Sequence, residues 1–174
     1  MIRIVSVVLL IAIDTAALAQ TPAKLSLGVN FLVPATSTVN KSFGAGVNLA
    51  GELYFSDKFS ATARAGYLFF KGKITTWDNN EVENFAMLPV LVGGRFYIRH
   101  FFTSLETGVA IQANENTGTN LVVSPSIGYK RQRFDIAVYL FGVPQTFASF
   151  PENSYFIKGG YSYFGLRANY SRGK

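Results

Sequence analysis

The stretch FGAGVNLAGELYFSDKFSATARAGYLF, from Phe43 to Phe69, decides the fold class. Apolar side chains recur at every second position on both sides of a short polar break, Ser56 to Lys58. A period of two is that of a β-strand, because successive side chains point to opposite faces of a sheet. Two such runs joined by so few residues form a hairpin. The stretch therefore predicts two long antiparallel strands, 43–55 and 59–69, joined by a tight turn.

The same alternation continues outward through the rest of the chain and predicts six further strands. Their ranges are 24–33, 84–98, 101–112, 120–129, 134–140 and 163–170. Pro89 and Pro125 lie inside two of them, where each removes a donor from the hydrogen-bond ladder. We expect bulges or local register breaks at both prolines.

The connections alternate strictly between short and long. The short ones are 56–58, 99–100 and 131–133, and the long ones are 34–42, 71–83, 113–119 and 143–155. Bacterial outer-membrane barrels have this asymmetry, with tight periplasmic turns and longer outer loops, whereas a soluble β-sandwich has no reason to sort its loops in this way.

Composition indicates which face of the sheet is outside. The 174 residues include no cysteine, 15% are charged, and the mean hydropathy is +0.22. The face opposite the apolar one carries mainly Gly, Ser, Ala and Asn, which suit the narrow interior of an eight-stranded barrel better than a water-facing sheet. The sequence therefore predicts an all-β, eight-stranded antiparallel up-and-down transmembrane β-barrel with its apolar face turned outward.

The N-terminus has the pattern of a secretory signal peptide. Arg3 precedes an apolar core, Ile4 to Ile13, and small residues stand at Ala17 and Ala19. The apolar run is shorter than the ~20 residues of a transmembrane helix. We expect a signal peptide over residues 1–19 and a barrel domain over 20–174, exported to the outer membrane of a Gram-negative bacterium.

Aromatic residues recur on the apolar face near the predicted periplasmic end of seven strands. They are Phe55, Phe59, Phe96, Phe101, Tyr129, Phe134 and Tyr170. In a closed sheet they would form one ring at one height, as in the aromatic girdle at a membrane interface.

Seven charged residues are predicted to project into the lumen from the periplasmic half. They are Glu52, Arg64, Arg95, Glu106, Lys130, Asp135 and Arg167. Unpaired charges in a narrow barrel are costly, so opposite signs should pair across the turns: Glu52 with Arg64, Arg95 with Glu106, and Lys130 with Asp135. We expect an ionic plug, and the alternative is a wet pore with independently hydrated charges.

Two stretches carry a resemblance to a known family. PVLVGGRFY from Pro89 to Tyr97, and FGLRANY from Phe164 to Tyr170, together with strand count and loop parity, resemble the outer-membrane β-barrel domain family, including small OmpA-like and OmpX-like barrels. The resemblance covers residues 24–170 and implies insertion by the barrel-assembly machinery, which reads a final strand ending in an aromatic residue. Here Tyr170 is followed by four more residues.

The sequence offers little for catalysis or metal binding. The single histidine, His100, falls in a predicted turn without a base-and-nucleophile arrangement. Asp78 to Glu83 is rich in oxygen ligands but lacks the spacing of a calcium loop. The net charge of +6 is spread along the chain, which argues against nucleic acid. We expect no enzymatic activity, no cofactor and no metal.

Functional candidates remain in the outer loops, which carry Trp77, Phe147, Phe150 and Tyr155 with Lys41, Lys71 and Lys73. The lysines could meet lipopolysaccharide phosphates, and the aromatics could contact a partner or rest at the lipid headgroups. The leading interpretation is a monomeric structural or surface-binding barrel in outer-membrane lipid. The alternatives are a narrow channel, a lipid-directed barrel enzyme and a soluble periplasmic ligand-binding barrel.

Overall fold

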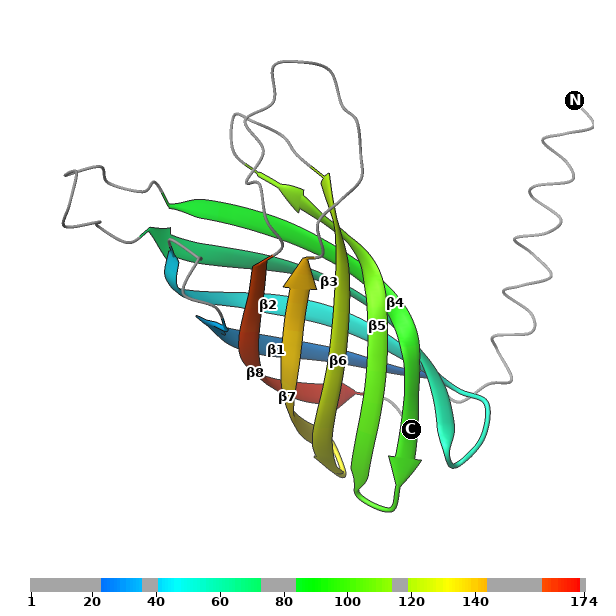
Figure 1. The fold of residues 1–174 in the computed structure, drawn as a ribbon. Helices are drawn as coiled ribbons and strands as arrows, with labels where there is room; N and C mark the ends of the chain where they lie inside the picture. Colours follow the sequence, from blue (N-terminus) through cyan, green and yellow to red (C-terminus); the bar gives the residue numbers. More distant parts are fainter. Residues whose placement is uncertain (1–22, 36–40, 73–83, 114–118, 144–160, 173–174) are drawn as a thin grey trace, which may run out of the picture.

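Eight antiparallel strands pair in sequence order and close into one barrel (Figure 1). The computed structural model describes residues 23–35, 41–72, 84–113, 119–143 and 161–172. The strands are β1 Ala23–Pro34, β2 Lys41–Tyr54, β3 Phe59–Gly72, β4 Phe85–Ile98, β5 Phe101–Gln112, β6 Thr119–Arg131, β7 Phe134–Val143 and β8 Tyr161–Arg172. Pairing of β8 with β1 closes the barrel, with Leu27 opposite Tyr170. The predicted fold class is confirmed, and the strand ends differ from the predicted ones by a few residues.

Three tight connections lie together at one end of the barrel, which we call the turn end (Figure 1). They join β2 to β3, β4 to β5, and β6 to β7. Arg99 and Gln132 have positive φ angles of 57° and 52°, which let the last two connections reverse the chain over very few residues. The other end, where the longer connections attach, is called the loop end.

The apolar face of every strand points outward. Leu27 is 64% exposed, Leu105 58% and Ile127 69%. On β4, Leu88, Val90 and Val92 also point outward, whereas Met87 and Leu91 are buried inside, as the alternation predicted. Strands of 10 to 14 residues are long enough for the apolar band of a transmembrane barrel, which needs about 9–11. Within the described ranges, no helix is long and apolar enough to cross a membrane.

The two strand prolines interrupt one ladder each without moving the register. Pairing of β3 with β4 skips the position of Pro89 and resumes in the same register. Pairing of β6 with β7 likewise skips Pro125. The expected register breaks at these residues are therefore wrong, because a missing N–H removes a bond to one neighbour and leaves the other ladder intact. The described register shift is elsewhere, between Lys41 and Phe43 in β2.

Several predicted features lie outside the described residues. These are the signal peptide, 1–19, the Asp78 to Glu83 stretch, and the loop residues Lys73, Trp77, Phe147, Phe150 and Tyr155. Of the three candidate loop lysines, Lys41 is the first residue of β2, and the side chain of Lys71 is exposed at the loop end of β3.

Candidate functional site in the barrel lumen

The turn-end half of the lumen is filled by charged side chains. Each strand from β2 to β8 supplies one of them, and together they are the seven residues named from the sequence. Six are buried, and the Lys130 side chain is 10% exposed at the turn end of the barrel. These side chains point inward because they alternate along each strand with the residues that face outward.

Glu106 on β5 accepts hydrogen bonds from two arginines. Its Oε2 accepts from Arg64 Nε at 3.1 Å and from Arg167 Nη1 at 3.2 Å, while its Oε1 accepts from Arg64 Nη2 at 3.1 Å. Thr62 and Asn48 complete this group by donating to Glu106 and accepting from Arg64, respectively. The bidentate Arg64 pair is the geometry in which a buried carboxylate is best compensated.

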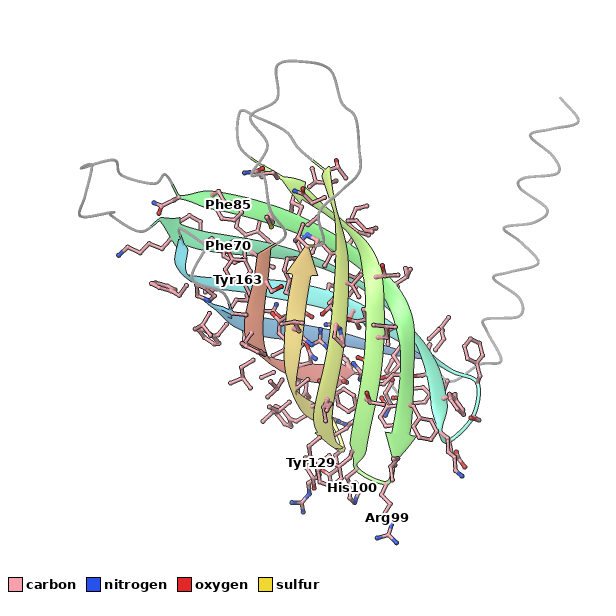
Figure 2. The ribbon with its side chains drawn as sticks, viewed as in Figure 1. Phe70, Phe85, Arg99, His100, Tyr129 and Tyr163 are labelled. Carbon is pink, nitrogen blue, oxygen red and sulfur yellow. The ribbon has the colours of Figure 1, made fainter. Side chains whose placement is uncertain are left out.

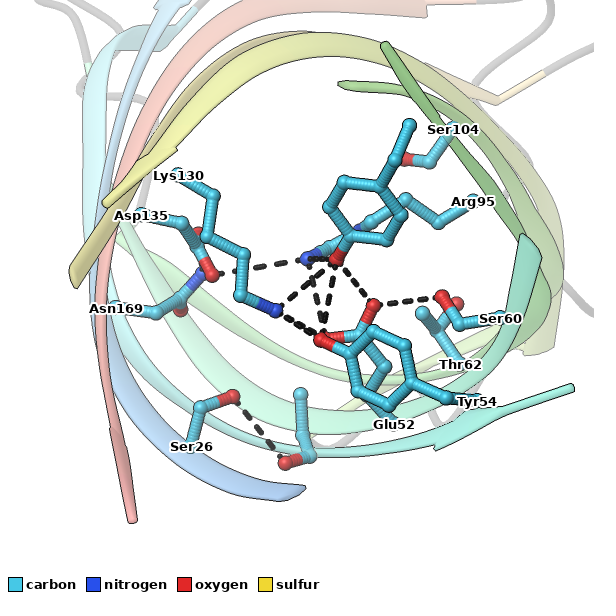
Figure 3. Close-up of polar contacts among 12 residues, drawn as sticks. Ser26, Glu52, Tyr54, Ser60, Thr62, Arg95, Ser104, Lys130, Asp135 and Asn169 are labelled. Atoms are coloured by element: carbon cyan, nitrogen blue, oxygen red, sulfur yellow. Dashed lines mark hydrogen bonds and ion pairs between the residues drawn. The ribbon is translucent and has the colours of Figure 1, made fainter. Parts of the chain in front are cut away.

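The carboxylate of Glu52 on β2 is the shared acceptor of a second group of polar side chains, nearer the turn end (Figure 3). Its carboxylate accepts from Ser60 Oγ at 2.6 Å, from Tyr54 OH at 2.7 Å and from Lys130 Nζ at 2.7 Å. The Tyr97 hydroxyl also donates to it, and Lys130 donates to both Tyr54 and Tyr97. Two phenols, one hydroxyl and one ammonium therefore converge on a single carboxylate.

Arg95 on β4 links this group to Asp135 on β7. Its Nη1 lies 3.6 Å from Glu52 Oε2 and 3.6 Å from Asp135 Oδ2, and its guanidinium lies over the Phe102 ring at 4.2 Å. Asn169 Nδ2 donates to Asp135 Oδ1 at 2.6 Å. The contacts thus cross the lumen from β2 through β4 to β7 and β8 (Figure 3). We call the seven charged residues and these polar partners the ionic layer.

The ion pairs join different partners from those suggested by the turns. Arg64 and Arg167 pair with Glu106, Arg95 and Lys130 pair with Glu52, and Arg95 also pairs with Asp135. The expected cross-turn pairs, Glu52–Arg64, Arg95–Glu106 and Lys130–Asp135, are not the ion pairs of the described structure. Strand tilt in a barrel brings residues of non-adjacent strands to the same height, and long side chains reach across the narrow lumen to them.

The loop-end half of the lumen contains a large apolar cluster, which the sequence analysis missed. Its members are Leu32, Leu68, Phe70, Phe85, Met87, Leu91, Ala110, Val122, Tyr139, Phe141, Val143 and Tyr163. Phe70 stacks on Phe85 with ring centroids 4.7 Å apart and packs against Tyr163 at 4.7 Å. Figure 2 labels these three rings at the end opposite Arg99. We call the cluster the aromatic layer.

Glycines on neighbouring strands make room for the bulky inward rings. A Cβ on Gly165 would lie 2.3 Å from Cζ of Tyr139, and one on Gly44 would lie 2.6 Å from Cε1 of Phe70. Both glycines stand directly opposite these aromatics in the strand register. An inward aromatic that faces a glycine is the sequence signal that could have identified the aromatic layer. The expectation of a lumen lined mainly by small residues was therefore incomplete.

The seven residues predicted as the aromatic girdle all lie on the outer face near the turn end. Phe59 packs against Phe96 at 4.8 Å, Phe101 against Tyr129 at 5.4 Å, and Phe134 against Tyr170 at 5.0 Å. The first member, Phe55, is 71% exposed beside the β2–β3 turn. Phe96 is half-buried, and the others are exposed. Cross-strand aromatic pairs of this kind stabilise the pairing of neighbouring strands.

His100 lies in the β4–β5 turn, with its ring 5.8 Å from that of Tyr129. The described residues contain no group of three or more His, Cys, Asp or Glu side chains that could hold a metal ion. The polar residues that the structure brings together are therefore those of the ionic layer, where every carboxylate is paired with a cation.

No protein-family model and no curated protein sequence matches the chain. Solved structures do match. The crystal structure of Ail, the attachment invasion locus protein of Yersinia pestis, superposes with a TM-score of 0.56 at 12% identity, covering 87% of this chain and 99% of that one. This chain has the fold of the small outer-membrane β-barrels.

Two other structures support the same assignment of fold. Outer membrane protein Ail in a phospholipid bilayer nanodisc matches with a TM-score of 0.56 at 11% identity, over 86% of this chain and 99% of that one. The N-terminal β-barrel domain of Pseudomonas aeruginosa OprF matches with a TM-score of 0.50 at 11% identity, over 88% of this chain and all of that domain. The resemblance drawn from the sequence is confirmed at the level of the fold.

Proposed function

We propose that this protein is an integral barrel of the bacterial outer membrane whose lumen is closed, and that its outer loops carry a structural or surface-binding role. The observation that carries the proposal is the presence of two successive layers of buried side chains inside the barrel. The ionic layer draws one charge from each of seven strands. The aromatic layer draws residues from every strand except β2, whose Gly44 lies beneath Phe70.

The outer face supports the membrane location. A continuous apolar surface of Leu, Val, Ile and Phe surrounds the barrel and ends at the aromatic girdle. Exposed apolar patches of this extent are rare on soluble proteins. A soluble periplasmic barrel would need its aliphatic face inside, whereas this chain buries six charged side chains in its lumen and exposes the aliphatic residues of its outer face.

The closed lumen favours a binding role over a channel. Arg167 and Glu106 lie at the centre of the barrel with 2% and 1% exposure, and Tyr139 stacks under the Arg167 guanidinium at 5.2 Å. Recognition would then fall to the outer loops on a rigid scaffold. Within this proposal, lipopolysaccharide phosphates are partners for Lys41, Lys71 and Lys73, and the barrel-assembly machinery inserts a monomer.

We expect no steady ion conductance when the purified barrel is reconstituted in planar bilayers, because either layer alone blocks the path of an ion. Phe70→Ala with Phe85→Ala thins the aromatic layer, and Glu52→Ser with Lys130→Ser thins the ionic layer. Each pair of substitutions, and the four together, should leave the barrel closed, because Glu106, Arg64 and Arg167 still occupy the centre of the lumen. Folding of every variant is checked by heat-modifiable gel migration. Steady conductance from the native protein would refute the closed lumen and favour the channel.

A further inference from the structure

Four exposed arginines gather on one side of the turn end. Arg99 lies in the β4–β5 turn, Arg131 ends β6, Arg133 lies in the β6–β7 turn, and Arg172 ends β8. We call these four residues the basic edge. The residues beside them in the chain, His100, Gln132 and Ser171, bring no acidic side chain.

Backbone contacts place the members of the basic edge next to one another. Lys130 N donates to His100 O at 2.7 Å, which fixes the end of β6 against the β4–β5 turn. Ser171 N donates to Arg133 O at 2.6 Å, which fixes the end of β8 against the β6–β7 turn. The β4–β5 turn, the β6–β7 turn and the end of β8 therefore present their arginines on one continuous stretch of the rim.

The basic edge stands at a defined height relative to the aromatic girdle. Arg131 follows Tyr129 by two residues and Arg172 follows Tyr170 by two residues, so each shares the outward face of its tyrosine. Two residues of strand advance the chain by about 7 Å. Arg133 Nη1 also lies 3.4 Å from Tyr170 OH. Figure 2 shows Arg99 and His100 beyond Tyr129 at this end.

Cations just beyond an aromatic girdle and facing outward lie at the level of the lipid phosphates. Arginine binds phosphate oxygens in a forked, bidentate geometry. We propose that the basic edge is a binding site for anionic phospholipid headgroups in the leaflet that the turns face. This inference rests on the proposed membrane location and adds a preferred lipid class at one side of the rim.

The experiment measures lipid selectivity of the reconstituted barrel. Spin-labelled phosphatidylglycerol and spin-labelled phosphatidylcholine are compared in phosphatidylcholine vesicles at low ionic strength, and the ratio of their association with the protein is determined. One cation at the headgroup level favours an anionic lipid by about fivefold. We expect the native barrel to prefer phosphatidylglycerol by at least that factor and to lose part of the preference at high salt.

The variants distinguish a local lipid-binding site from an effect of the protein's overall positive charge. Arg131→Gln with Arg172→Gln removes two of the four cations of the basic edge and should lower the ratio several-fold. Lys24→Gln with Lys58→Gln removes the same charge from positions outside the basic edge, the first of them over the Tyr54 ring, and should keep most of the preference. Arg131→Lys with Arg172→Lys retains the charge and should keep it too.

Equal losses in the two glutamine variants, or no preference in the native barrel, would overturn the inference. The native chain is also tested for insertion by heat-modifiable migration. An inserted barrel without lipid preference refutes the lipid site alone, whereas failure to insert refutes the proposed function and the lipid site with it.

Discussion

Replacing Glu106 with alanine should lower the free energy of unfolding by about 3–5 kcal/mol, the usual cost of removing one partner from a buried ion pair. Glu106 is the shared acceptor of Arg64 and Arg167, whose side chains are 5% and 2% exposed. Without it, two guanidiniums remain in a narrow lumen with no carboxylate within ion-pair distance among the described pairs. Urea unfolding in detergent micelles, followed by gel migration, measures the loss.

Two controls distinguish the loss of charge compensation from the loss of side-chain volume. Asp57→Ala removes an exposed carboxylate from the β2–β3 turn and should change the free energy of unfolding by less than about 0.5 kcal/mol. Arg64→Met, Glu106→Leu and Arg167→Met together replace the whole group by apolar residues and should recover most of the stability. A Glu106→Ala barrel as stable as the native one would contradict the assignment of the ionic layer.

Replacing Leu105 with arginine should destabilise the membrane-inserted barrel by about 2–4 kcal/mol, because the charge would enter the apolar band of the bilayer. Leu105 points outward from β5. It follows Thr103 by two residues and the girdle residue Phe101 by four, in the direction away from the turn end. Its position places it well inside the band that the girdle bounds. Unfolding in phospholipid vesicles by urea measures the effect.

Leu105→Met is the matched control, since methionine keeps an apolar side chain of similar volume, and it should cost less than about 1.5 kcal/mol. The comparison tests the facing of the sheet directly. In a soluble barrel, an outward arginine would be hydrated and nearly neutral in stability. A Leu105→Arg barrel that inserts and unfolds like the native protein would contradict the membrane-facing assignment.

The strands and their facing could be predicted from the sequence because both depend on local information. A period of two fixes the facing of each residue relative to its neighbours, so Phe59 and Phe101 were placed outward and Arg95 inward before any pairing was known. The alternation of short and long connections then predicted that the tight turns lie at one end of the barrel. The aromatic girdle could be predicted from the position of each aromatic residue relative to the turn next to it in the chain.

The partners inside the lumen could not be predicted in the same way. Which cation reaches Glu52 depends on strand tilt and on the reach of Arg95 and Lys130 across the barrel, and neither is encoded in one hairpin. The phenols of Tyr54 and Tyr97 escaped notice because only charged side chains were considered as partners inside the lumen. The aromatic layer was missed because the inner face was interpreted as lined mainly by small residues, although the glycines opposite its rings mark its position.

The division between lumen and surface has a functional consequence. If the lumen is closed as proposed, solutes have no path through the barrel, and binding would take place at its two rims. The loop end would meet the cell surface, and the turn end would meet the periplasmic leaflet. The proposed lipid site and the proposed loop contacts therefore concern opposite ends of the same scaffold.

Electrophoretic migration of the protein from isolated outer membranes, compared before and after boiling, tests the membrane-barrel account most directly. We expect the protein to fractionate with the outer membrane, to need detergent for extraction, and to migrate differently when unheated, because a closed barrel resists unfolding by the detergent of the gel. Recovery in the aqueous periplasmic fraction without detergent, with identical migration before and after boiling, would contradict the account.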